Sequence, residues 1–281
     1  MPASSARNRA RRLARAGPFD RAQGTSPPLV CPLVLAQAAE IEALPAGQFL
    51  TDPTKLANGL RALHGAFGTD VIVTAAADDL AASSLAAAAA GAAGAAGHPR
   101  VTAAVEATRR LAATTEDAVL AAALCGPVQL AAQLGRPPSD SAVLEECGAV
   151  LLALATAFLE AGAHLLLVVE AGPVPRAVAD GWRSAVTPLV NVARFRQAAA
   201  AVVLADPADA ALAPRGAVVC LPPAASGPGQ GIALDADPAA WPASALRPAG
   251  VPLVTTLGPV RGGFAECRAA VGQLTAALAG G

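Results

Sequence analysis

Eight short apolar runs, each followed by a longer segment, constrain the fold of this chain more than any other feature. The runs are four to seven residues long, are rich in Val, Leu and Ala, and lie at 29–35, 70–75, 119–124, 165–169, 201–204, 217–220, 232–235 and 252–256. Strands that are apolar on both faces belong in a parallel sheet covered by helices. Their alternation with helices predicts an α/β protein, a (βα)8 TIM barrel.

The segments between the runs carry helix ends that can be recognised. In TDPTKLANGLRALHGAFG, Asp52 stands at a capping position, Pro53 at the first helical position and Gly68 at the stop. After residue 204 the segments become short, and residues 221–231 leave room only for a loop. We therefore expect shortened units on the C-terminal side of the barrel, with an open or partial barrel as the alternative.

The first 27 residues differ in charge from the rest of the chain. They hold six arginines against one acid, Asp20. A basic, acid-poor segment is typical of a disordered tail, and a targeting segment or a nucleic-acid arm are the alternatives. We expect a disordered basic tail over 1–27 and a single barrel domain over 28–281.

Cysteine usage and composition limit the compartment and the partners. The five cysteines are widely separated and form no C-x-x-C pair, which indicates reduced thiols in the cytoplasm. The acidic body and 3% aromatic content argue against nucleic-acid binding. Glu160, Gly162 and His164 divide the apolar stretch 149–169 into a helix, a turn and a strand, so no membrane span is expected. The expected partner is a small-molecule substrate, and a homodimer is left open.

Acidic side chains follow several of the predicted strands, where barrel enzymes carry their chemistry. Asp78 and Asp79 follow the second run and Glu170 follows the fourth. Such carboxylates can accept N–H bonds, bind cations or act as acid and base. Later acids at 206, 235 and 237 stand near Pro, which favours loop or capping roles. The three histidines have no Cys or His at ligand spacing, so no metal site is expected.

Several segments together resemble one enzyme superfamily. CGPVQLAAQL at 125–134 resembles the G-P-W-T-L-A segment of the uroporphyrinogen decarboxylase superfamily, which also includes cobalamin-dependent methyltransferases. Four other segments, at 51–73, 157–172, 234–241 and 256–271, are also similar to segments of the family, and all five occur along the chain in the family's order. The resemblance implies a barrel of the uroporphyrinogen decarboxylase type with a funnel at its C-terminal face.

The resemblance also implies an activity and a set of site residues. Decarboxylases of this superfamily bind a polycarboxylate tetrapyrrole without a cofactor, and Asp78 matches the Asp that binds its pyrrole N–H groups. Asp78 is therefore expected to be catalytic, with Asp79, Gln133 and Glu170 binding substrate. The implied reaction is that of a carboxy-lyase acting on a porphyrinogen-like or other small carboxylic acid. A cobalamin-linked methyltransferase-like protein and a non-catalytic small-molecule-binding barrel are the alternatives.

The chain departs from the superfamily pattern at several positions. The Arg-rich signature of the decarboxylases has only the echo RAQG at 21–24, and Pro259 stands where the family has His. The methyltransferase branch binds zinc through His and Cys, but here the corresponding position holds Ala205 and Asp206. Cys220 alone cannot make such a site.

Overall fold

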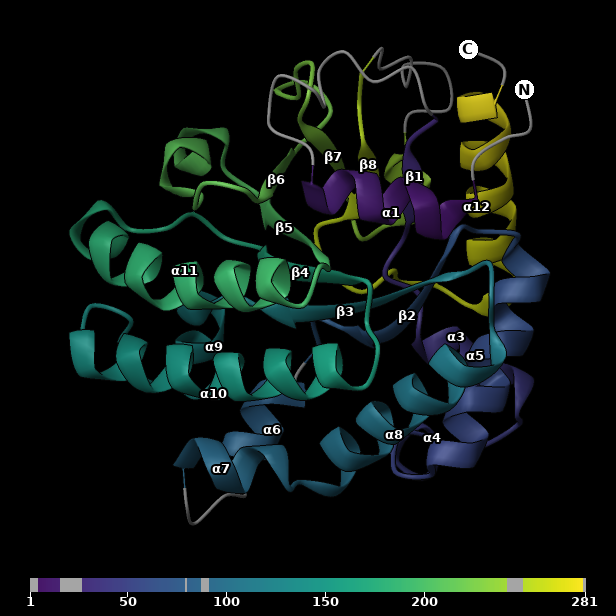
Figure 1. Ribbon diagram of the computed structural model, residues 1–281, viewed down its shortest axis with the longest axis horizontal. Coiled ribbons are helices and arrows are strands. Elements are labelled where there is room, and N and C mark those ends of the chain that lie inside the picture. Colours follow the sequence, from purple (N-terminus) through teal and green to yellow (C-terminus); the bar gives the residue numbers. More distant parts are fainter. Residues whose placement is uncertain (1–4, 16–26, 79, 87–90, 242–249, 280–281) are drawn as a thin grey trace.

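The computed structural model describes residues 5–15, 27–78, 80–86, 91–241 and 250–279, and these form a barrel of parallel strands (Figure 1). The sheet has eight strands in the order β1-β8-β7-β6-β5-β4-β3-β2, and every paired neighbour is parallel. The strands are β1 (Leu29–Cys31), β2 (Val71–Ala76), β3 (Val119–Cys125), β4 (Leu165–Glu170), β5 (Ala199–Leu204), β6 (Val218–Leu221), β7 (Gly231–Leu234) and β8 (Leu253–Thr256). The predicted (βα)8 barrel is confirmed.

Helices separate most of the strands. The described α-helices are α1 (Ala6–Arg15), α3 (Ala36–Ile41), α4 (Ala46–Phe49), α5 (Pro53–Phe67), α6 (Leu80–Ala86), α7 (Gly91–Ala96), α8 (Pro99–Thr114), α9 (Pro127–Gln133), α10 (Ser141–Glu160), α11 (Ala179–Phe195) and α12 (Phe264–Ala279). Figure 1 shows α10 and α11 side by side along the barrel. The units from β5 to β7 are short, as expected, and their described residues include the 3-10 helices η2 (Pro207–Leu212) and η3 (Pro238–Ala240), whereas the long helix α12 follows β8.

Helix α5 shows how the sequence sets the ends of an element. The Asp52 carboxylate accepts hydrogen bonds from the backbone N–H groups of Thr54 at 2.8 Å and Lys55 at 3.0 Å. Pro53 occupies the first turn, where a missing N–H costs nothing. Gly68 ends the helix at φ 64°, the left-handed conformation that glycine adopts without steric cost. All three boundary predictions are confirmed.

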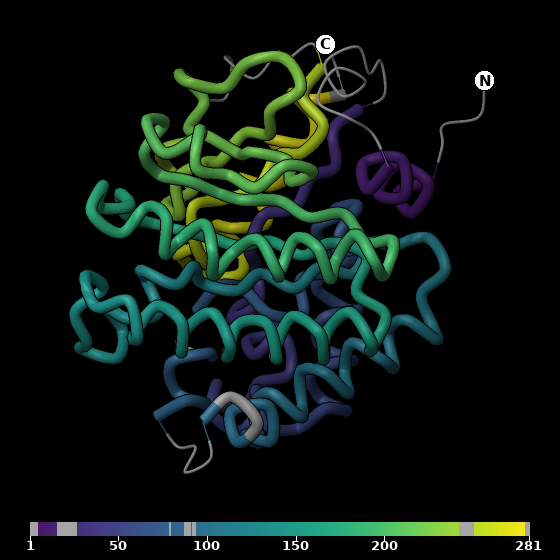
Figure 2. Tube along the Cα trace, turned by 60° about the vertical axis from the view of Figure 1, so that its left-hand side comes forward, coloured from purple at the N-terminus to yellow at the C-terminus, as the bar shows by residue number. Residues whose placement is uncertain are grey.

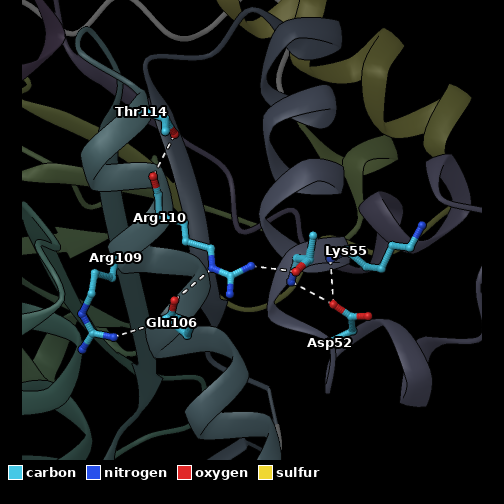
Figure 3. A network of polar contacts seen from close by, with 7 residues as sticks. Asp52, Lys55, Glu106, Arg109, Arg110 and Thr114 are labelled. Atoms are coloured by element: carbon cyan, nitrogen blue, oxygen red, sulfur yellow. Dashed lines mark hydrogen bonds and ion pairs between the residues drawn. The ribbon is translucent and has the colours of Figure 1, made fainter.

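A polar network on the surface joins α5 to α8 (Figure 3). Arg110 donates one hydrogen bond to the Thr54 hydroxyl at 2.7 Å and another to Glu106 at 2.9 Å. Glu106 also pairs with Arg109 one helical turn along α8. These exposed ion pairs each contribute little to stability, so the buried apolar faces of the two helices carry their packing.

Two sets of strand residues alternate between the lumen and the helical layer. Val30 and Val254 pack with Leu274 of α12, which marks their face of the sheet as the outer one. Cys31 and Thr255, next to them in sequence and paired in register, therefore point into the lumen. The register places Cys220 on the same inner face through its pairing with Gly231. This part of the lumen is lined by small, uncharged side chains.

Helix α1 packs across the N-terminal ends of the strands (Figures 1 and 2). Ala10 and Leu13 are buried, and Arg7 donates to the backbone carbonyl oxygens of Ala118 at 3.1 Å and of Thr115. The structure thus differs from the expected disordered tail over residues 6–15; residues 1–4 and 16–26 lie outside the described part. Ala10 and Leu13 stand three residues apart in an Arg-rich segment, and they give the helix an apolar face that charge counting overlooks.

Helix α1 also reaches the seam of the barrel. No ladder joins β1 to β2 in the described sheet. The Asp70 carboxylate bridges this gap by accepting the backbone N–H of Val30 at 3.4 Å, and Arg9 of α1 pairs with the same carboxylate. An ion pair therefore lies where the strands lack backbone bonds.

Helix α10 is long and apolar enough to cross a membrane by length and composition alone. In the structure, 56% of its apolar window is buried within the protein, as in a core helix. The helix ends at Glu160 and β4 begins at Leu165, so the predicted division of this apolar stretch into a helix, a turn and a strand is confirmed.

Candidate functional site at the C-terminal ends of the strands

Asp78 lies two residues after the end of β2, at the C-terminal end of the barrel. One carboxylate oxygen accepts the backbone N–H of Leu80 at 3.0 Å, and the other pairs with Arg100 of α8 at 3.0 Å. The preceding residue, Ala77, has φ 56°, and its N–H donates to the carbonyl oxygen of Ala123 at 2.7 Å. Asp78 therefore links the end of β2 to the start of α6 and to α8, and 27% of its side chain is exposed.

A small cavity lies beside the Asp78–Arg100 pair. Its walls combine these two residues with apolar side chains such as Leu35, Leu56 and Leu80, and its volume is about 10 Å³. A space of this size holds about one water molecule. A larger ligand would reach Asp78 from its exposed side.

Glu170 ends β4 and is the most deeply buried carboxylate described, with 1% of the residue exposed. Its side chain points away from the lumen, toward α9 and α11. One oxygen, Oε1, accepts the backbone N–H of Gln129 at 2.8 Å. The other, Oε2, accepts the N–H of Val128 at 3.2 Å and the indole N–H of Trp182 at 2.6 Å. The carboxylate thus connects β4, the first turn of α9 and α11.

The turn between β3 and α9 is built to fit this carboxylate. A Cβ placed on Gly126 would lie 2.5 Å from the carboxyl carbon of Glu170, so any side chain here collides with it. The N–H of Gly126 donates to the carbonyl oxygen of Val169 at 2.7 Å. The Gln129 side chain completes the link, because its amide oxygen accepts the N–H of Ala171 at 3.2 Å.

The surroundings of Glu170 favour its neutral form. Burial raises its pKa to about 7, although the N–H bonds from Gln129, Trp182 and Val128 oppose that shift. Asp209, another buried acid, adds a like charge nearby, and its own carboxylate accepts the N–H of Val174 at 2.8 Å. A carboxyl that titrates near neutral pH is a common feature of functional sites, and structural networks produce it as well.

The remaining predicted site residues are placed as follows. Gln133 lies at the end of α9 with an exposed side chain, and Asp79 lies outside the described residues. The roles assigned to Asp78, Asp79, Gln133 and Glu170 stay predictions. Asp206 and Asp237 cap η2 and η3 by accepting backbone N–H bonds at 2.9 Å each, which confirms the capping interpretation.

A zinc site made of His and Cys does not fit the described residues. His64 lies on α5, His98 directly precedes α8, and His164 accepts the N–H of Leu120 at the N-terminal end of β3. Within the described ranges, no group of three or more His, Cys, Asp or Glu side chains could hold a metal ion.

Two residues that sequence reasoning missed complete these contacts. Arg100 binds Asp78 from α8, and the buried Trp182 binds Glu170 from α11. Trp182 is one of two tryptophans in a chain with 3% aromatic residues, so its rarity could have marked it as a candidate site residue. Nothing in the sequence distinguished Arg100, because it is one of nineteen arginines in the chain.

Comparison with known proteins supports the fold. No family model matches the chain, and no curated protein sequence matches it either. Among solved structures, it is similar to a methyltransferase from Methanosarcina mazei with a TM-score of 0.70 and 13% sequence identity. The match covers 98% of this chain and 98% of that one. At this identity the likeness shows a shared barrel architecture.

Proposed function

We propose that this chain is a methyltransferase-like barrel protein that binds a small molecule at the C-terminal ends of its strands, beside Asp78. The observation that carries the proposal is the full-length likeness to a methyltransferase barrel. The sequence resemblance to a superfamily with a methyltransferase branch agrees with it. Asp78 is a part-exposed carboxylate at the end where barrels of this type bind their ligands.

A zinc-activated thiol has no support in the described residues, so no step through a metal is proposed. The chain's own contribution would be binding. Asp78 can accept an N–H or O–H group of the ligand on its exposed side while Arg100 binds the carboxylate from α8. Glu170 and Gly126 would hold α9, which begins at the same end of the barrel.

Decarboxylation of a porphyrinogen-like acid stays a prediction. It requires cationic groups around the substrate carboxylates. The described arginines of the N-terminal segment lie on α1, at the opposite end of the barrel, and Arg7 and Arg9 are bound there to Ala118, Thr115 and Asp70. No contact described at the C-terminal face favours this reaction over methyl transfer.

The remaining expectations stay part of the proposal. Residues 28–281 would form one barrel domain, with α1 attached to it. A cytoplasmic location is supported by the five cysteines, which are all buried and widely separated along the chain. A small molecule is the proposed partner, and a second copy of the chain stays open.

The test is to incubate the purified protein with methylcobalamin and 2-mercaptoethanol and to follow loss of the cobalt-bound methyl group by visible absorbance. A parallel incubation with uroporphyrinogen, analysed for decarboxylated products, tests the other reaction. We expect methyl loss that Asp78→Asn weakens and that the remote variant Arg61→Ala leaves unchanged. Decarboxylation without methyl transfer would overturn the proposal. A protein that neither binds methylcobalamin nor removes its methyl group would overturn it as well.

A further inference from the structure

We propose that the Glu170 carboxylate is a proton-operated latch that sets how firmly the β3–α9 turn is held against β4 and α11. The latch has three hydrogen bonds, from the backbone N–H groups of Val128 and Gln129 and from the indole N–H of Trp182. This inference goes beyond the proposed function, and its test needs no ligand.

The ionised carboxylate is held by hydrogen bonds alone. Among the described residues Glu170 forms no ion pair, and the titratable groups that interact with it electrostatically include the acid Asp209 from η2 and the thiols of Cys125 in β3 and Cys147 in α10. Burial keeps both thiols protonated, since it raises the pKa of each. The three N–H donors offset part of the cost of burying the charge of this carboxylate.

Proton uptake changes the two oxygens unequally. Oε2 receives two N–H donors and Oε1 receives one, so a proton from solvent binds the lone pair that is still free on Oε1. The resulting hydroxyl oxygen is uncharged, and it accepts the N–H of Gln129 more weakly than the carboxylate oxygen does. The neutral acid therefore keeps Val128 and Trp182 and holds Gln129 less firmly.

The weaker bond to Gln129 loosens the start of α9. The Gln129 side chain also holds Ala171, the residue after Glu170, so the amide and the side chain of one residue connect α9 to β4 at two points. Gly126 leaves no free space for the carboxyl group to move toward the turn. The expected effect of acid is thus local, confined to α9 and the loop after β4.

The experiment is a pH titration of the full chain by ¹H–¹⁵N NMR. The chain has two tryptophans, so the indole N–H region should contain two signals. The Trp182 signal, bonded to Glu170, should shift with one midpoint between about pH 6 and about pH 8, and the backbone N–H of Gln129 should shift with the same midpoint. The Trp241 indole donates to the backbone carbonyl of Asp235 at 2.8 Å and serves as an internal reference that should not follow this transition.

Two variants assign the transition. Glu170→Gln should abolish it, and Asp209→Asn should keep it while lowering its midpoint, because a neighbouring negative charge is removed. A Trp182 signal that does not titrate between about pH 5 and about pH 9, or that titrates unchanged in Glu170→Gln, would overturn the proposal. If Glu170→Gln does not fold, the comparison of the Trp182 and Trp241 signals in the wild-type protein still tests the proposal.

Discussion

Replacing Gly126 by Ala tests the fit between the β3–α9 turn and Glu170 with a single methyl group. Gly126 has φ −75° and ψ 166°, a conformation that alanine adopts without strain. The cost is therefore steric: the new Cβ would lie 2.5 Å from both the carboxyl carbon and Oε2 of Glu170. Either the turn or the carboxylate must move away.

The magnitude follows from the bonds that such a movement breaks. Overpacking a buried site costs about 1–3 kcal/mol. A hydrogen bond to a charged group contributes about 1.5–3 kcal/mol, and the movement weakens at least one of the three that Glu170 accepts. We expect Gly126→Ala to lower the free energy of unfolding by about 3 kcal/mol, measured by urea denaturation at slightly alkaline pH.

A double-mutant cycle separates this cause from a general effect of alanine. In a Glu170→Ala background the added methyl group meets no carboxylate, so Gly126→Ala should cost less than about 1 kcal/mol there. Gly272→Ala is the matched control, because nothing lies within 4 Å of a Cβ at that helical position, and it should be neutral or stabilising. Equal costs of Gly126→Ala in both backgrounds would refute the steric fit.

Three further predictions concern other parts of the account. Burial raises the pKa of Glu170 from 4.5 to about 7, so the folded state binds the proton more tightly than the unfolded state does. The stabilisation from this proton is full below about pH 4.5 and is lost as pH rises through 7, a change of up to about 3 kcal/mol in the free energy of unfolding. A plot of unfolding free energy against pH should lack this change in Glu170→Gln. Arg9→Ala should lower the unfolding free energy by about 1 kcal/mol and speed hydrogen exchange of the Val30 amide, which pure surface electrostatics would not do. Trp182→Phe removes one donor to Glu170 and should destabilise the protein by about 2 kcal/mol in thermal or urea unfolding, whereas Trp241→Phe should cost less.

The strands could be predicted because runs of consecutive apolar residues indicate strands that are buried on both faces. β3 and β4 are apolar on both faces, and the observed bounds match the predicted runs within one residue. β1 is shorter than the run 29–35 because Pro32 has no N–H to give to a ladder and ends the strand at Cys31. The helix α1 was not predicted from composition, because arginines outnumber its two buried residues.

The candidate site was less predictable, because its contacts join residues that are distant in sequence. The position of Glu170 at a strand end could be predicted, but its direction depends on register, which turns it outward to α9 and α11. Its partner Gly126 stands 44 residues earlier, and the steric reason for that glycine exists only in three dimensions. Asp78 was predicted as a catalytic group, and its pairing with Arg100 depends on where α8 packs.

Hydrogen–deuterium exchange with and without methylcobalamin tests most directly whether the C-terminal ends of the strands bind the ligand. We predict slower exchange in peptides that span the end of β2 and the start of α6, and in those that span the β3–α9 turn, with no change in α1. Protection confined to α1, or no protection at a methylcobalamin concentration that saturates binding, would contradict the account.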